Sequence, residues 1–149
     1  KRSGGMIILP HPYDAHKLSD DWVSEVDAIE IFNGRSSDIN NVKSEHLAKR
    51  LSKPVIYSAD AHLLRNLGNV IIAKPELMSF EDAVIKNLIS VIHKCPSPKS
   101  DIILSQIIKS YKTRNIKLFF RIILSPSVEF IRHRFPRVFY YLKYIRDKI

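Results

Sequence analysis

The stretch that decides the fold is Pro54-Val55-Ile56-Tyr57-Ser58-Ala59-Asp60-Ala61-His62. Its apolar run at residues 55–57 is β-branched and aromatic, which is typical of a strand covered on both faces. Because residues two apart on an extended chain point the same way, Asp60 and His62 can reach one point just beyond the strand. A carboxylate and a neutral imidazole are common ligands of zinc, manganese and iron. A turn aspartate followed by a partly buried histidine would give the same pattern.

Two upstream runs repeat the pattern of a buried strand followed by polar or ligand-type residues. The first ends in a histidine and reads Gly5-Met6-Ile7-Ile8-Leu9-Pro10-His11-Pro12. The second ends in polar residues and a glycine and reads Ala28-Ile29-Glu30-Ile31-Phe32-Asn33-Gly34-Arg35. In α/β folds the chemistry lies at the carboxyl ends of parallel strands. Three successive strands with such endings therefore favour a metal site over three unrelated turns.

Helix patterns alternate with these strands along the first part of the chain. We expect helices from Ser19 or Asp20 to Val26, from Asp38 to Leu51 and from Ser79 to His93. A short helix or turn at residues 63–68 and a further strand at residues 69–73 complete the pattern. Strict alternation predicts a parallel sheet with right-handed crossovers, in about four β/α units or roughly half of a barrel.

The polar residues of the second run have more than one reading. Arg35 and Asn33 follow a strand end, where they can contact a substrate phosphate. A solvated loop arginine and a turn asparagine are the alternatives. Glu30 alternates with isoleucines inside the strand, so a hydrogen-bonding role is favoured over a catalytic one.

Length and composition indicate a globular protein. The 149 residues are enough for a domain with its own core, and 45% are hydrophobic and 26% charged. The single cysteine, Cys95, excludes a disulfide framework and indicates a reducing, cytoplasmic location. The first residues lead directly into a strand, so we expect the chain to begin inside a domain. The strand at residues 6–9 would then be an exposed edge open to self-association.

The charge is unevenly placed. Residues 1–94 hold 12 Lys and Arg against 12 Asp and Glu, whereas residues 95–149 hold 12 against 3 and account for the net charge of +9. This predicts a domain at 1–94 and a linker with a basic helical tail at 95–149, broken near residues 113–115, 125–126 and 135–136. Basic residues interleaved with aromatics at 109–149 suit nucleic acid or an anionic membrane surface. The alternative is a helical appendage whose cations face solvent.

The three strand runs together resemble the C-terminal half of a PHP (polymerase and histidinol phosphatase) domain, a family of metal-dependent phosphoesterases. The residues from Gly5 to Pro12 resemble its third motif and those from Ser58 to His62 its fourth. The run 28–35 resembles the strand and loop between them, and Leu67-Gly68-Asn69 resembles the continuation, so that the resemblance covers residues 4 to 94.

The resemblance implies a fold, a reaction and a set of site residues. The fold would be part of a distorted, seven-stranded (β/α) TIM-like barrel with two or three manganese, zinc or iron ions at the strand ends. His11, Asp60 and His62 would be metal ligands and catalytic residues. The reaction would be hydrolysis of a phosphate ester by metal-activated water. The substrate could be a nucleotide, an oligonucleotide or a small phosphate monoester.

The chain departs from the family in lacking its first two motifs, a His-x-His pair and further His and Glu ligands. Three ligands could hold one metal ion loosely but could not build the family's multinuclear site. The chain is then either a fragment without the first half of the domain, or a half-domain that does not catalyse. In the second case its tail would bind nucleic acid or an anionic membrane.

Overall fold

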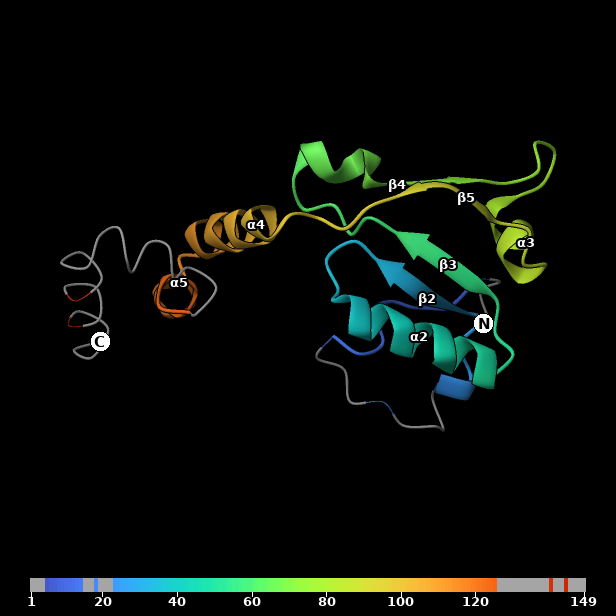
Figure 1. Cartoon of the computed structure of the whole chain (residues 1–149), viewed down its shortest axis with the longest axis horizontal. Helices are drawn as coiled ribbons and strands as arrows, with labels where there is room; N and C mark the ends of the chain where they lie inside the picture. Colours follow the sequence, from blue (N-terminus) through green and yellow to red (C-terminus); the bar gives the residue numbers. More distant parts are fainter. Residues whose placement is uncertain (1–4, 15–17, 19–22, 126–139, 141–143, 145–149) are drawn as a thin grey trace. The chain divides into compact units, whose positions relative to one another are not determined.

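The computed structural model describes residues 5–14, 18, 23–125, 140 and 144 (Figure 1). The chain divides into two compact units, Lys1–Ser97 and Pro98–Ile149. The predicted helix start at Ser19 or Asp20 lies outside the described residues, as does the predicted helix break at 135–136.

The first unit contains a parallel sheet of three strands. Strands β1 (Ile8–Leu9), β2 (Ala28–Asn33) and β3 (Val55–Ser58) lie in the order β1-β2-β3, and both pairs are parallel. This confirms the predicted parallel pairing of the three runs. Strand β1 is shorter than the predicted 6–9. An irregularity between Glu30 and Phe32 shifts the register of β2 on β3.

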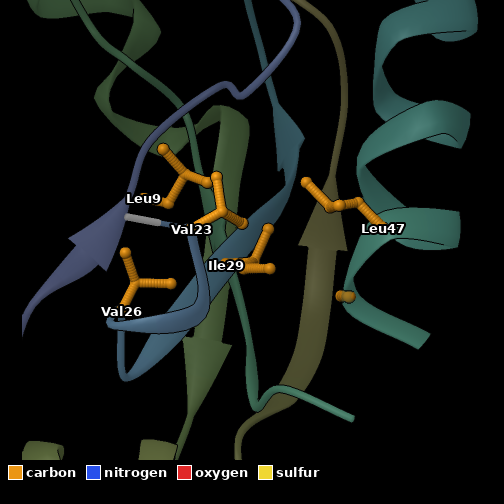
Figure 2. Close-up of a cluster of buried hydrophobic side chains, with 6 residues drawn as sticks. Leu9, Val23, Val26, Ile29 and Leu47 are labelled. Carbon is orange, nitrogen blue, oxygen red and sulfur yellow. The ribbon is translucent and has the colours of Figure 1, made fainter. Parts of the chain in front are cut away.

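One helix covers a face of this sheet. Helix α2 (Asp38–Arg50) runs along β2, and the side chain of its N-cap Ser37 accepts from the Asn40 backbone N–H (Figure 1). A serine oxygen at the N-cap satisfies one of the free amides of the first turn. The buried hydrophobic cluster between sheet and helix is shown in Figure 2 and consists of Leu9, Val23, Val26, Ile29, Leu47 and Ala48.

The rest of the first unit corrects the prediction of strict alternation. After the 3-10 helix η1 (Leu64–Asn69) come β4 (Val70–Ala73), α3 (Phe80–Ile85) and β5 (Ser90–Lys94), and β5 pairs with β4 antiparallel. A single helix from Ser79 to His93 is therefore wrong, although Ser79 does cap α3. The helix ends because Asn87 takes a left-handed backbone, with φ of 55°. The β-branched residues that follow favour a strand.

Among the described residues the two sheets remain separate and no barrel is closed. The fold is therefore α/β with a parallel three-stranded sheet, and the seven-stranded barrel stays a prediction.

The second unit is helical where it is described. Helix α4 (Lys99–Lys112) is followed by α5 (Ile116–Ile123), and the break at residues 113–115 was predicted. The predicted linker ends earlier than expected, because Lys99 and Ser100 already form the first turn of α4. In the described part of the chain, no helix combines the length and the apolar character needed to cross a membrane.

Candidate functional site

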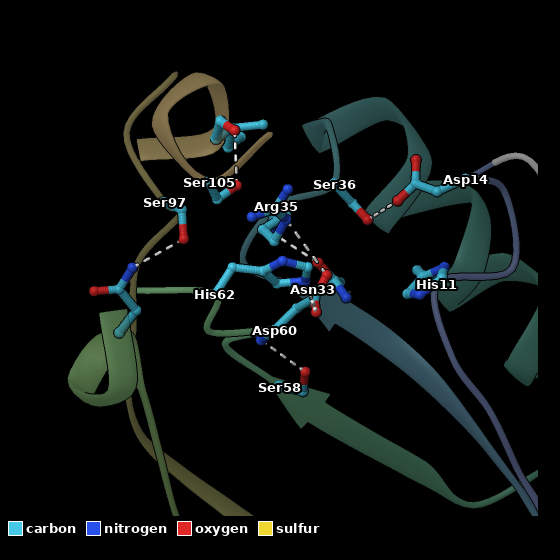
Figure 3. Close-up of polar contacts among 12 residues, drawn as sticks. His11, Asp14, Asn33, Arg35, Ser36, Ser58, Asp60, His62, Ser97 and Ser105 are labelled. Carbon is cyan, nitrogen blue, oxygen red and sulfur yellow. Dashed lines mark hydrogen bonds and ion pairs between the residues drawn. The ribbon is translucent and has the colours of Figure 1, made fainter. Parts of the chain in front are cut away.

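Three side chains meet beyond the carboxyl ends of β2 and β3. Arg35 Nε lies 3.6 Å from Asp60 Oδ2, and His62 Nε2 lies 3.3 Å from Asp60 Oδ1. Figure 3 shows the three side chains together above the ends of the strands. The arginine side chain is 12% exposed, whereas the Asp60 and His62 side chains are 30% and 44% exposed. A small anion or cation can therefore reach the carboxylate and the imidazole from solvent.

A buried polar network lies beneath this group. The Glu30 carboxylate accepts from the His11 backbone N–H at 2.6 Å and from the Asn33 side-chain amide at 3.1 Å. The Asn33 side-chain oxygen accepts from the Arg35 backbone N–H at 2.8 Å. The network thus joins the ends of β1 and β2 and fixes the backbone on either side of the site. The hydrogen-bonding role predicted for Glu30 is confirmed.

Asn33 is itself held by helix α2. Its backbone N–H donates to Asn41 Oδ1 at 3.0 Å, and its backbone carbonyl accepts from Asn41 Nδ2 at 3.3 Å. Asn33 is only 2% exposed. Burial and the use of both ends of its amide favour a positioning role, whereas the sequence suggested a contact with substrate.

Gly34 lets two loops come into contact. A Cβ built on Gly34 would lie 2.8 Å from the Ala59 carbonyl oxygen. The Gly34 N–H donates to the Ser58 carbonyl at 2.9 Å, and its carbonyl accepts from the Ser97 N–H at 2.5 Å. Only a residue without a side chain fits between these segments. This contact sets the spacing between Arg35 and Asp60.

A second set of hydrogen bonds fixes the loop after β1. The Asp14 carboxylate accepts from the Ser36 hydroxyl, and it also accepts from Asn40 Nδ2 at 2.7 Å. Asn40 Nδ2 also donates to the Tyr13 carbonyl at 3.2 Å. Sequence reasoning missed these residues and Asn41. The clusters of short polar residues around the start of α2 were the available signal.

The backbone at two predicted ligands is unusual. Five non-glycine residues in the described ranges have positive φ. Three of them, Ser52, Asn87 and Arg114, follow helices whose ends make the paired hydrogen bonds of a Schellman motif. The other two are His11, with φ of 28°, and Asp60, with φ of 47°. No helix end accounts for them, and backbone strain of this kind is concentrated at functional sites.

The structure brings together two of the three predicted metal ligands. Asp60 and His62 converge, but His11 lies apart from them in Figure 3. Within the described ranges no group of three His, Cys, Asp or Glu side chains is placed to hold a metal ion. Asp60 and His62 alone supply an oxygen and a nitrogen of the kind that divalent ions bind. A metal ion held with His11 as the third ligand stays a prediction.

Comparison with known proteins gives a distant relative. The chain is 27% identical over 88 residues to an uncharacterized protein, MJ0417, of Methanocaldococcus jannaschii. The match covers 52% of this chain and 37% of that protein, so the chain spans well under half the length of this relative. No family model matches the chain, and no solved structure matches it.

Proposed function

We propose that the first unit provides part of a metal-dependent phosphoesterase site of the PHP type. The observation that carries the proposal is the meeting of Arg35, Asp60 and His62 at the carboxyl ends of parallel strands. A guanidinium beside a carboxylate and an imidazole offers a group for phosphate and two groups for a cation. The left-handed backbone at His11 and Asp60 supports a functional role for both.

The residues divide into two roles. Asp60 and His62, with His11 as the third ligand, would hold a divalent ion such as manganese, zinc or iron. A bound divalent ion lowers the pKa of a water molecule and neutralises charge on a phosphoryl group. Arg35 would bind phosphate oxygens, since its planar guanidinium matches them. Its ion pair with Asp60 keeps it aimed at the site before substrate binds.

The buried residues would support these groups. Glu30 and Asn33 fix the backbone of His11 and Arg35, so they would act through those residues. In the proposal the parallel sheet belongs to a seven-stranded (β/α) barrel that holds two or three ions. Such a site needs more ligands than His11, Asp60 and His62, and the substrate would be a phosphate ester of a nucleotide, an oligonucleotide or a small alcohol.

The test combines metal binding with hydrolysis. The protein is titrated with Mn²⁺ by calorimetry, and release of phosphate from p-nitrophenyl phosphate is followed separately. Asp60→Asn and His62→Ala should each weaken Mn²⁺ binding by at least about tenfold. Loss of a group that only supports a metal ligand already costs about tenfold to a hundredfold in affinity. Arg35→Ala should leave Mn²⁺ binding intact and raise KM, because the arginine binds phosphate.

The matched control is His46→Ala, which removes an exposed histidine of α2 that is not among the predicted site residues. It should change neither readout. Mn²⁺ binding that survives Asp60→Asn unchanged, or that falls equally in His46→Ala, would reject the proposed site.

A second candidate function is binding without catalysis, by the basic tail. A separate observation favours it: residues 102–125 contain five basic and no acidic residues. The surface that carries these cations is considered next.

A further inference from the structure

The second unit exposes an apolar groove between α4 and α5, the two helices in its described part. The groove has a volume of about 880 Å³, and its apolar lining comes from Ile107, Ile108, Tyr111, Ile116 and Phe119. Tyr111 is 85% exposed and Ile116 is 49% exposed. Lys112 and Arg114 also line it. The groove therefore combines water-exposed apolar surface with positive charge.

Helix α4 shows its apolar side to solvent. Leu104, Ile108 and Tyr111 are exposed, and their spacing of four and three residues places them on one helical face. The residues that α4 buries are polar, namely Asp101, Ser105 and Ser110. A contiguous apolar face of this kind is the usual mark of an interaction surface.

From residue 102 to residue 125 all the charged residues have one sign. The five basic residues between positions 102 and 125 are Lys109, Lys112, Arg114, Lys117 and Arg121, and every one is exposed. No Asp or Glu occurs in the same stretch. The surface is therefore complementary to a partner that carries dense negative charge.

The apolar residues decide between two anionic partners. Nucleic acid would neutralise the cations, and Tyr111 could stack on a base, but aliphatic side chains would gain little from it. A lipid surface can interact favourably with aliphatic, tyrosine and basic side chains together. Aliphatic side chains enter the acyl boundary, tyrosine lies at the level of the head groups, and basic side chains contact anionic lipids.

We propose that the α4–α5 surface docks the protein on an anionic membrane surface. Leu104, Ile108 and Ile116 supply the buried apolar area, and the surrounding lysines and arginines select anionic lipid. The proposal does not depend on the phosphoesterase site, because every residue in it belongs to the second unit.

The test uses the whole chain and sedimentation with vesicles. Vesicles of phosphatidylcholine with phosphatidylserine should carry the protein down, and vesicles of phosphatidylcholine alone should carry down much less. Ile108→Ser with Ile116→Ser should reduce the partition coefficient by about tenfold or more, since two apolar side chains leave the lipid. Lys112→Glu with Arg114→Glu should reduce it by at least roughly fivefold for each residue at low salt, because each change removes a cation and adds an anion.

The matched control is Leu77→Ser with Lys86→Glu, which removes a fully exposed leucine and reverses a charge in the first unit. It should bind vesicles like the unchanged protein. Circular dichroism checks that each variant is folded. Tyr111→Ala provides a variant with little risk to folding, because this side chain is 85% exposed, and it should bind severalfold more weakly.

Three outcomes would overturn the proposal. The first is no preference for anionic vesicles. The second is equal loss of binding in the Leu77→Ser, Lys86→Glu control. The third is tighter binding to a single-stranded oligonucleotide than to vesicles. If the charge reversals weakened that binding and Ile108→Ser with Ile116→Ser did not, the surface would be assigned to nucleic acid.

Discussion

The two sheets of the first unit differ in burial and in what their ends carry. In the parallel sheet, Leu9, Ala28 and Ile29 are buried, and helix α2 covers one face. In the antiparallel pair, by contrast, Ile71 is 46% exposed and Ile92 is 68% exposed. The parallel strands all finish at the same edge, whereas β4 and β5 finish at opposite ends of their ladder.

The difference shows what parallel pairing does for a site. Side chains that follow three parallel strands share one edge, so Arg35 can meet Asp60 even though 25 positions of sequence separate them. An antiparallel pair places its two carboxyl ends apart and cannot gather such residues. The same sheet also holds the core, so the site stands on the most firmly packed part of the unit.

The largest expected effect is a loss of folding stability in the core of the parallel sheet. Ile29→Ala should lower the free energy of unfolding by about 2–5 kcal/mol, because it opens a cavity at a fully buried residue. Ile92→Ala, the matched change in the antiparallel pair, should stay within about 0.5 kcal/mol. Denaturant unfolding measures both. Equal losses at the two positions would mean that the antiparallel pair is packed as tightly as the parallel sheet.

The next effect concerns Glu30, a buried carboxylate of the parallel sheet that has no counterpart in β4 or β5. Glu30→Ala leaves the partly buried His11 N–H and the buried Asn33 amide without this acceptor, at a cost of up to about 1–3 kcal/mol for each donor. Glu30→Gln keeps an acceptor oxygen and should cost less. Unfolding curves of the two variants test this order. If both variants were as stable as the unchanged protein, the network would contribute nothing to the fold.

Gly34 tests the contact between the loops that follow β2 and β3 in the parallel sheet. Gly34→Ala places a Cβ 2.8 Å from the Ala59 carbonyl oxygen and should cost about 1–3 kcal/mol. Gly68→Ala is the control, because a Cβ there meets no atom within 4 Å. Thermal unfolding should separate the two. A Gly34→Ala protein as stable as the Gly68→Ala protein would show that the loops can move apart freely.

The smallest effect is a dependence on alkaline pH. Burial raises the pKa of Tyr57 on β3, with a lesser contribution from the negative charge of Glu45. Since ionisation is harder in the folded state, stability is complete below the ordinary tyrosine range and falls as the pH rises above about 10. Tyr57→Phe should flatten part of that fall. Unfolding measured across alkaline pH reports it, and identical slopes for the two proteins would contradict the prediction.

The sequence was sufficient for the parts of the fold that depend on local pattern. The runs that became β2 and β3 were recognised from buried, β-branched residues, and the spacing of Asp60 and His62 indicated that these two side chains would lie together. The contact of Arg35 with Asp60 was not predicted, because it depends on how the loops after β2 and β3 pack against each other around Gly34. The barrel and the metal ion remain untested predictions.

Other features depend on contacts that local pattern does not record. The segment from Phe80 to Val91 has helical spacing of its apolar residues, yet Asn87 ends the helix and β5 pairs with β4. The partners Asp14 and Ser36 lie 22 positions apart, and Asn41 meets Asn33 through the fold of α2 onto the sheet. Such hydrogen bonds are fixed by tertiary placement, so a single sequence does not reveal them.

The left-handed backbone at five non-glycine residues in the described part of the chain suggests where this protein could be made more stable. At Ser52 and Arg114, glycine would relieve the strain of a helix end without touching the strand ends. At Asp60 the same replacement would relieve similar strain but would remove the carboxylate that Arg35 and His62 share. At Asp60, therefore, a gain in stability would come at the cost of the candidate site, whereas at Ser52 and Arg114 it would not.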